Sequence, residues 1–214
     1  MRGTQDSLSF LAFHFLTLAR RLGQALQLTL TLAPMTAFSG IILRKIRFSE
    51  TSLILGWFTD QHGKLKTMVK GALRPKSPFA GKLDLFFHCE LLVSFSQKSE
   101  LHALREVSVK EPFAAVRTSY LRTLTASYFA ELVEEVTEPE HAVVEIYDLC
   151  LRALNYLNTR EPDLRAIQFF EFELCRFLGV ETQRPDSGAE RLAEAFGSLP
   201  GSRTDLLRVL AERL

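Results

Sequence analysis

The chain has 214 residues, of which 47% are hydrophobic and 24% are charged. A chain of this length and composition can bury a hydrophobic core, which excludes a wholly disordered protein. The formal net charge of +1 does not indicate any particular class of binding partner. Residues 44–82, however, carry nine basic and two acidic side chains, whereas residues 112–214 carry eleven arginines and seventeen acidic side chains. This asymmetry points to a polyanionic partner for the basic segment, unless its charges only solvate a surface.

The first 34 residues differ in character from the rest of the chain and are considered separately. Residues 8–19 are largely apolar and are followed by Arg20 and Arg21. Twelve apolar residues are too few to span a bilayer, and no clear signal-peptide cleavage site follows them. We therefore expect translation to start at Met35, or residues 1–34 to be an unpacked extension. A secretory or membrane-tethering signal is the alternative.

Five short segments have the alternation or the composition typical of β-strands. The predicted strands cover residues 41–48, 53–58, 64–70, 83–95 and 101–109. Alternation is clearest in the third, where Leu65, Thr67 and Val69 share one side and basic residues dominate the other. Residues 71–82 contain two glycines and two prolines, which predicts a loop. Five strands in about 70 residues favour a small closed or partly open barrel.

From residue 112 onward the apolar period becomes that of helices. One long helix is predicted from the stripe Val116, Tyr120, Leu124, Tyr128, Leu132 and Val136. A second helix can begin at Pro139, and a third runs from a capping Asp163 to Gly179. The third is apolar around most of its circumference and should be central. Two short helices follow at residues 189–196 and 204–214, so the domain boundary is predicted near residues 108–113.

The basic half suggests a nucleic-acid site, because single-strand binding proteins combine a basic groove with aromatic rings on which bases stack. The candidate phosphate-binding residues are Arg44, Lys45, Arg47, Lys64, Lys66, Lys70, Arg74, Lys76 and Lys82. Phe79, in the polar loop, is the best candidate for stacking. Trp57 and Phe58 are either further stacking platforms or part of the barrel core.

The sequence contains no recognisable catalytic or metal-binding motif. Its five histidines share no metal-ligand spacing, its three cysteines are isolated, and it has no P-loop or G-x-S-x-G elbow. His88 and His102 are expected on strand surfaces. We therefore predict a protein that is not an enzyme and that uses no cofactor, metal or small-molecule substrate.

Short motifs in the basic half resemble those of RecO, a family of bacterial recombination mediators. They are FT at residues 58–59, HGK at 62–64, ETSL at 50–53, VKGA at 69–72 and RPKS at 74–77. Leu83, Phe86 and the LH and RE pairs of residues 101–106 fit as well. The helical half resembles the family more loosely, at residues 172–179.

The resemblance implies an α+β protein, with a five-stranded OB-fold barrel at residues 35–110 and an all-helical C-terminal domain at residues 111–214. It implies a mediator of recombinational DNA repair that binds single- and double-stranded DNA and anneals complementary strands. The implied partners are RecR, with which the protein would help load RecA, and the C-terminal tail of the single-stranded DNA-binding protein. The implied location is the cytoplasm, in association with the nucleoid and without membrane attachment.

The sequence departs from the family pattern at its C-terminal end. Many family members carry a four-cysteine zinc module after the position of Leu178 and Gly179, but residues 180–188 contain no cysteine. We therefore predict no zinc, and the rest of the chain also looks short for the family. The alternative function is an adaptor whose barrel binds an acidic protein surface and not DNA.

Overall fold

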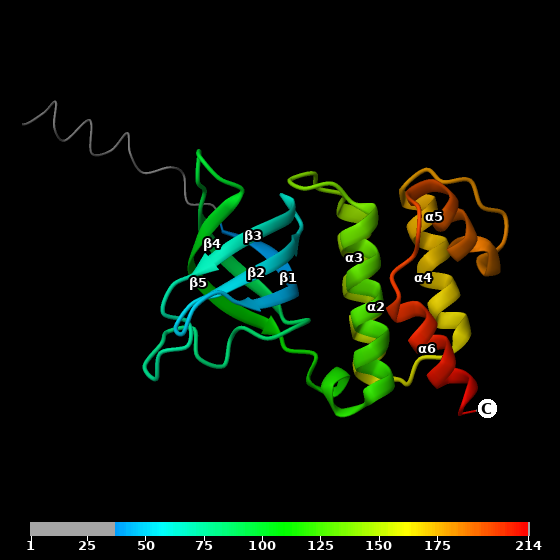
Figure 1. Cartoon of the computed structure of the whole chain (residues 1–214), viewed down its shortest axis with the longest axis horizontal. Helices are drawn as coiled ribbons and strands as arrows, with labels where there is room; N and C mark the ends of the chain where they lie inside the picture. Colours follow the sequence, from blue (N-terminus) through cyan, green and yellow to red (C-terminus); the bar gives the residue numbers. More distant parts are fainter. Residues whose placement is uncertain (1–36, 214) are drawn as a thin grey trace, which may run out of the picture. The chain divides into compact units, whose positions relative to one another are not determined.

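The computed structural model describes residues 37–213, and within them a closed five-stranded barrel precedes a set of helices (Figure 1). The predictions for residues 1–34 fall outside this range. Around the barrel the strands follow the order β1-β2-β3-β5-β4, in which β3 and β5 are parallel and all other neighbours antiparallel. The strands are β1 (Ala37–Arg47), β2 (Leu53–Thr59), β3 (Gly63–Val69), β4 (His88–Ser94) and β5 (Leu101–Glu111). The predicted OB-fold barrel and the helical domain after it are confirmed.

The barrel interior is filled by the inward side of each strand. In β3 the side chains of Leu65, Thr67 and Val69 are buried, and Lys66 between them is exposed, as the alternation predicts. Trp57 is 1% exposed, and its indole Nε1 donates a hydrogen bond to Thr67 Oγ1 at 2.8 Å. The polar atom of this large ring is therefore satisfied inside the core.

A β-bulge in β1 decides which of its side chains face outward. Ile42 is opposite Trp57, but Arg44 is opposite Gly56, so Leu43 is the extra residue. Before the bulge, Ile41 and Phe58 turn to the helices and join the helical core, whereas Ile42 joins the barrel core. After it, Ile46 is 47% and Phe48 61% exposed, although both alternate with basic residues in the predicted strand. Bulges bend a strand and re-aim its side chains.

The predicted fourth strand begins five residues too early. Residues 83–87 lie outside β4, because Phe86 adopts a positive φ of 68°. The main chain there still contacts β1, since Phe86 N donates to Ile42 O at 2.8 Å and Ile42 N donates to Phe87 O at 3.1 Å. The turn sends neighbouring rings to different places: Phe86 enters the helical core and Phe87 the barrel core.

The helical part differs from the prediction in two places. Its elements are η1 (Ala114–Thr118), α2 (Tyr120–Val136), α3 (Val144–Thr159), α4 (Leu164–Phe177), η2 (Pro185–Ser187), α5 (Gly188–Phe196) and α6 (Ser202–Ala211). The long first helix is interrupted at Ser119, whose side chain caps α2, and Tyr120 is exposed. The second helix does not begin at Pro139, because Pro139 bridges to Lys64 of β3 and Glu140 N donates to Lys64 O at 3.1 Å.

The third predicted helix, α4, has the expected ends. Asp163 caps it by accepting a hydrogen bond from Ala166 N at 2.8 Å, and Gly179 follows it with a φ of +70°. Phe169, however, is 51% exposed, so α4 is not buried on all sides. Its buried side includes Glu171, which accepts hydrogen bonds from Tyr128 of α2 at 2.6 Å and from Arg203 of α6 at 2.7 Å.

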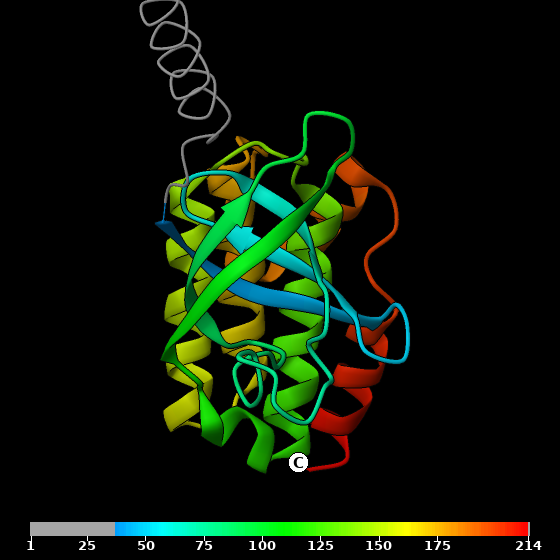
Figure 2. The same ribbon diagram turned by 90° about the vertical axis from the view of Figure 1, so that its left-hand side faces the viewer.

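None of the helices between residues 37 and 213 combines the length and the apolar character that a bilayer crossing requires. The view of Figure 2 looks onto the barrel, with the helices behind it. Ile41, Phe58 and Phe86 pack in the same apolar core as the helices, so one side of the barrel is held against them. The remaining sides of the barrel are where a further partner can bind.

Candidate nucleic-acid interface

One end of the barrel brings together the β1–β2 turn and the loop at residues 71–82. Arg47, Leu53 and Val69 lie in one row across β1, β2 and β3. Immediately beyond this row, Leu73 N donates to Thr51 O at 3.0 Å, which fastens the loop to the turn. In Figure 1 both segments lie at the lower left of the barrel. We call this region, residues 47–52 and 70–82, the loop end of the barrel.

The loop at residues 71–82 is a series of tight turns. Four backbone hydrogen bonds of 3.0–3.2 Å each span three residues, with the donors Arg74, Ser77, Ala80 and Lys82. Gly71 and Gly81 have φ values of +71° and +73°, which side chains other than glycine rarely adopt. The glycines and prolines that predicted a loop therefore give it a defined shape, with its backbone bonds made internally.

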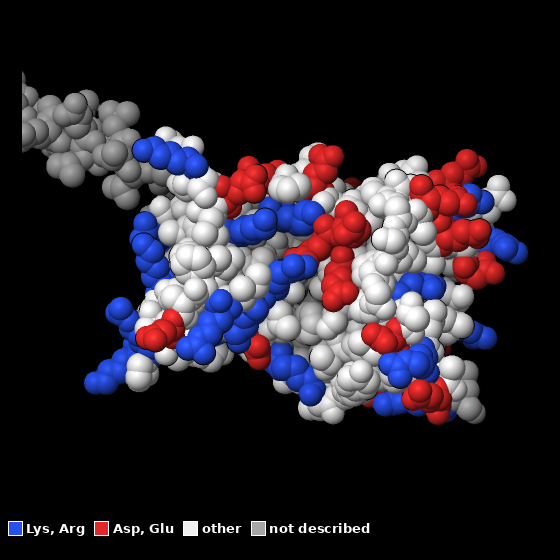
Figure 3. All heavy atoms as spheres, in the orientation of Figure 1, with Lys and Arg blue, Asp and Glu red and all other residues white. Residues whose placement is uncertain are grey.

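Four basic side chains of this end are exposed and take part in no ion pair within residues 37–213. They are Lys70, Arg74, Lys76 and Lys82. Arg47 is also exposed, and its guanidinium donates to the backbone oxygens of Ser49 and Glu50 at 3.3 and 3.4 Å. Figure 3 shows Lys and Arg side chains gathered at the lower left, over the loop end. An exposed group of cations without carboxylate partners can contact several phosphates at once.

Two of the predicted phosphate-binding residues are instead engaged with the helices. Arg44 forms an ion pair with Glu134 of α2. Lys64 is half-buried, and its Nζ donates to the backbone oxygen of Glu134 at 2.6 Å. Burial lowers the pKa of Lys64, although the carboxylates of Glu134 and Glu135 oppose the shift. These two cations serve the contact between the barrel and α2.

Two more predicted residues have intermediate positions. Lys45 pairs with Asp84 at 3.2 Å. Lys66 is exposed and lines a groove of about 980 Å³ between the barrel and α2. The helix side of this groove carries Glu131, Glu134 and Glu135. Its mixed charge makes it a poor phosphate site, because carboxylates repel a polyanion.

The aromatic candidates are less accessible than expected. Trp57 and Phe58 are 1% and 0% exposed, so they are core residues. Phe79 is partly buried, and its ring packs against the barrel core. The exposed aromatic side chain of this end is Phe48, which the sequence analysis gave only as the last residue of the predicted strand 41–48. The only signal for it is the polar stretch at residues 49–52 that follows it directly.

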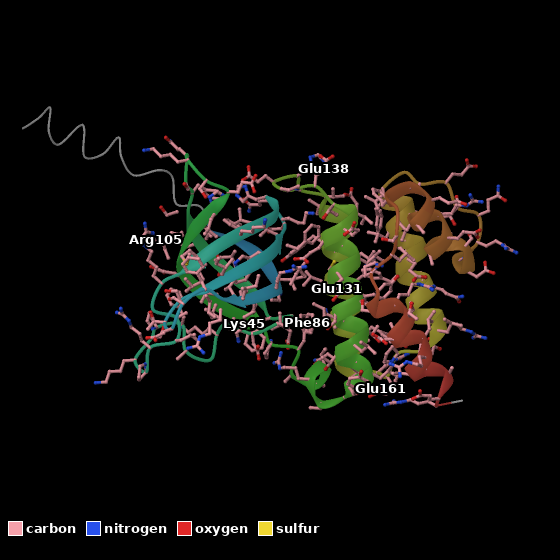
Figure 4. All side chains as sticks on the ribbon, viewed as in Figure 1. Lys45, Phe86, Arg105, Glu131, Glu138 and Glu161 are labelled. Carbon is pink, nitrogen blue, oxygen red and sulfur yellow. The ribbon has the colours of Figure 1, made fainter. Side chains whose placement is uncertain are left out.

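Sequence reasoning also missed Arg105 of β5. Figure 4 shows it projecting from the barrel on the side away from the helices, whereas Glu131 and Glu161 belong to the helical part. Arg105 is exposed and enters no ion pair within residues 37–213. It extends the basic character of the barrel beyond residues 44–82.

The histidines and cysteines show no arrangement for chemistry in the described part of the chain. No group of three or more His, Cys, Asp or Glu side chains between residues 37 and 213 could hold a metal ion. His102 is 4% exposed, so its predicted surface position is wrong, and His88 is also largely covered. Burial raises the pKa of the Cys89 and Cys150 thiols to about 12, so both stay protonated and unreactive near neutral pH.

Comparison with known protein families identifies the family of both halves of the chain. The family model "Recombination protein O N terminal" matches residues 35–113, and "Recombination protein O C terminal" matches residues 117–184. The chain belongs to the RecO family. Within the family's helical part, the stretch after α4 offers no thiolates, so residues 180–188 do not fit a four-cysteine zinc site.

Curated relatives with the name DNA repair protein RecO are similar over most of this chain. The protein of Rhodopirellula baltica is 30% identical over 65% of this chain and 52% of its own length. Those of Desulfatibacillum aliphaticivorans and Actinobacillus pleuropneumoniae serotype 7 are 30% identical over 71% and 65% of this chain, covering 58% and 57% of their lengths. The chain thus spans little more than half the length of these RecO proteins.

Proposed function

We propose that this RecO-family protein acts in DNA repair by binding DNA through the loop end of its barrel, without catalysing a reaction. One observation carries the proposal: Lys70, Arg74, Lys76 and Lys82 of the loop end are all exposed, and none of them forms an ion pair within residues 37–213. Membership of the family and the names of the relatives agree with it.

The chemistry of this end suits contact with sugar-phosphate backbones and not with base sequence. Lysine is a mobile point charge that does not require the fixed geometry of a bidentate pair. Backbone contacts of this kind accept single- or double-stranded DNA, and strand annealing needs binding that holds two strands without reading them. We therefore include annealing of complementary strands in the proposal.

The proposed DNA site is narrower than the sequence suggested. Arg47, Lys70, Arg74, Lys76 and Lys82 form its centre, and Arg105 of β5 is a further exposed cation of the barrel. Lys66 is left out, because carboxylates line the same groove. Arg44, Lys45 and Lys64 are left out, because Glu134 and Asp84 already engage them. Neutralising about five phosphates gives a slope of log affinity against log salt of roughly −3.5 for a single strand.

Charge reversal tests the proposal. Combining Lys70→Glu, Arg74→Glu and Lys76→Glu should weaken binding of a labelled single-stranded oligonucleotide at least about tenfold at moderate salt. A matched control combines Arg152→Glu, Arg160→Glu and Arg165→Glu, which are exposed on the helical part and outside every ion pair of residues 37–213. The control makes the same change in net charge and should bind nearly normally.

The outcomes separate the two functions. Equal losses in the two triple variants would mean that only net charge matters, and the loop end would not be the site. No binding by the unaltered protein at any salt would overturn DNA binding and favour the adaptor, whose barrel binds an acidic protein surface.

We further propose that the protein works with RecR to help load RecA, and that its helical part contacts the acidic tail of the single-stranded DNA-binding protein. Of the arginines that could receive such a tail, Arg122 and Arg176 pair with Glu161 and Glu173. Arg152 and Arg165 are in no ion pair among the described residues, so they are the better candidates. Annealing of oligonucleotides coated with the single-stranded DNA-binding protein tests DNA and partner contact together.

A further inference from the structure

Phe48 is the most exposed phenylalanine of the barrel, with 61% of its surface accessible. An exposed aromatic ring beside exposed cations combines the two features that single-strand binding proteins use, a face on which a base can stack and positive charges for the phosphates. Its position is fixed by the main chain and not by packing of the ring. Phe48 N donates to Ser52 O at 3.0 Å, closing the β1–β2 turn in which the next residues lie.

The surroundings of Phe48 carry more positive than negative charge, since Arg47, Lys70 and Arg74 are exposed against one carboxylate, Glu50. Phe48, Ser52 and Lys70 each stand one residue beyond the row Arg47, Leu53 and Val69, so they lie at the same rim of the barrel. Leu73, whose backbone bonds to Thr51, is 43% exposed and adds a second apolar side chain. Arg74 follows it. Glu50 in the same turn is exposed and forms no ion pair within residues 37–213.

We propose that Phe48 is a base-stacking residue that gives the loop end a preference for unpaired DNA bases. The proposal rests on the DNA binding proposed above and adds a selection between single and double strands. Phosphates would lie along Arg47, Lys70 and Arg74, and an unpaired base would cover the ring of Phe48. A duplex keeps its bases stacked on each other, so it can use the cations but not the ring.

The partly buried Phe79 does not compete for this role. Its ring packs against the barrel core, and its backbone N donates to Ser77 Oγ at 3.2 Å. A base can stack only on a ring face that solvent can reach, which at this end Phe48 offers. The charge complementarity of the surrounding cations selects a polyanion over an apolar protein surface as the occupant.

The test compares three probes of the same length: oligo(dT), a phosphodiester strand of abasic sites that has the same backbone charge, and a blunt duplex, which has a second backbone and is therefore compared only with itself across the variants. Phe48→Ala should weaken oligo(dT) binding about tenfold, because base stacking on a ring contributes that order of affinity. Binding of the abasic strand and of the duplex should change less than about twofold, and the salt slope for oligo(dT) should stay the same.

Two further variants keep the result interpretable. Phe48→Trp should retain oligo(dT) binding, and its exposed indole fluorescence should be quenched by oligo(dT) but not by the abasic strand. Leu73→Ala is the matched control, since it removes an exposed apolar side chain of the same surface that has no ring. It should change oligo(dT) binding less than about twofold.

The outcomes are distinct from those of the proposed function. If the unaltered protein binds oligo(dT) and Phe48→Ala binds it equally well, stacking by Phe48 is wrong and DNA binding stands. A uniform loss on all three probes would also overturn stacking, because it would indicate a role in shaping the cationic surface. Failure of the unaltered protein to bind any probe would overturn the proposed function itself.

Discussion

The loop end of the barrel and the side of the barrel that faces α2 both carry lysine and arginine, but these side chains have different partners in the two regions. On the helix-facing side, Arg44 forms an ion pair with the carboxylate of Glu134, and Lys64 donates a hydrogen bond to the backbone oxygen of the same residue. At the loop end, Lys70 and Lys76 have no such partner within residues 37–213. A count of basic residues therefore measures the potential for phosphate contact, and the fold decides which cations remain available for it.

Two glycines of positive φ give the largest test of this contrast: Gly63 packs against the segment before α3, and Gly81 lies at the loop end. A Cβ built on Gly63, whose φ is +58°, would lie 2.1 Å from His141 O, whereas a Cβ on Gly81 meets nothing within 4 Å. Gly63→Ala should lower the free energy of unfolding by about 3 kcal/mol, combining backbone strain with a steric clash. Gly81→Ala carries only the strain and should cost about 1 kcal/mol.

Urea denaturation followed by circular dichroism measures both variants. Oligonucleotide affinity under native conditions should remain normal for folded Gly63→Ala, because residues 139–141 are remote from the loop end in the sequence and pack on the β2–β3 turn. Equal costs for the two glycines would contradict the close contact between this turn and the segment before α3.

Charge reversal at one cation of each region should change a different property: stability on the helix-facing side and DNA affinity at the loop end. Arg44→Glu places a carboxylate beside Glu134 and should lower the free energy of unfolding by about 1 kcal/mol, with little change in DNA affinity at moderate salt. Lys76→Glu should leave stability unchanged, weaken binding, and reduce the salt slope by about 1.

The charge-swapped combination of Arg44→Glu with Glu134→Arg is the control for the first variant. It restores opposite charges at the same two positions, so it should recover much of the lost stability. Thermal unfolding and fluorescence titration measure the two properties. A large loss of DNA affinity in Arg44→Glu would show that Arg44 belongs to the DNA site after all.

The sequence predicts local structure well where the signal is local. The alternation at residues 64–70 and the capping of α4 by Asp163 depend on neighbours within a few positions, and both are confirmed. The bulge at Leu43 and the extended path at Pro139 depend on contacts with distant strands, and both were missed. The same distinction applies to the candidate site: Arg44 and Glu134 are 90 positions apart, so no local pattern indicates that they pair.

The smallest expected effect concerns His88, which lies at the start of β4 with its Nε2 buried and without a hydrogen-bond partner in the described structure. Burial lowers its pKa below 6.5, and Lys110 adds to the shift, against the opposing charges of Asp60 and Glu111. In the window between the folded pKa and 6.5, the unfolded chain binds more protons at this position than the folded chain. The free energy of unfolding therefore decreases as the pH falls through that window.

Replacing His88 by glutamine removes this titration, so His88→Gln should flatten the decline in stability between about pH 7.5 and about pH 5.5 by less than about 1 kcal/mol. Urea titrations of both proteins across that range isolate the difference, since the other histidines contribute equally to each. DNA affinity should be the same for both proteins at every pH, because His88 is not part of the loop end. A difference in affinity without a difference in stability would show that the two regions are coupled, and the division of the barrel into a structural side and a binding end would then fail.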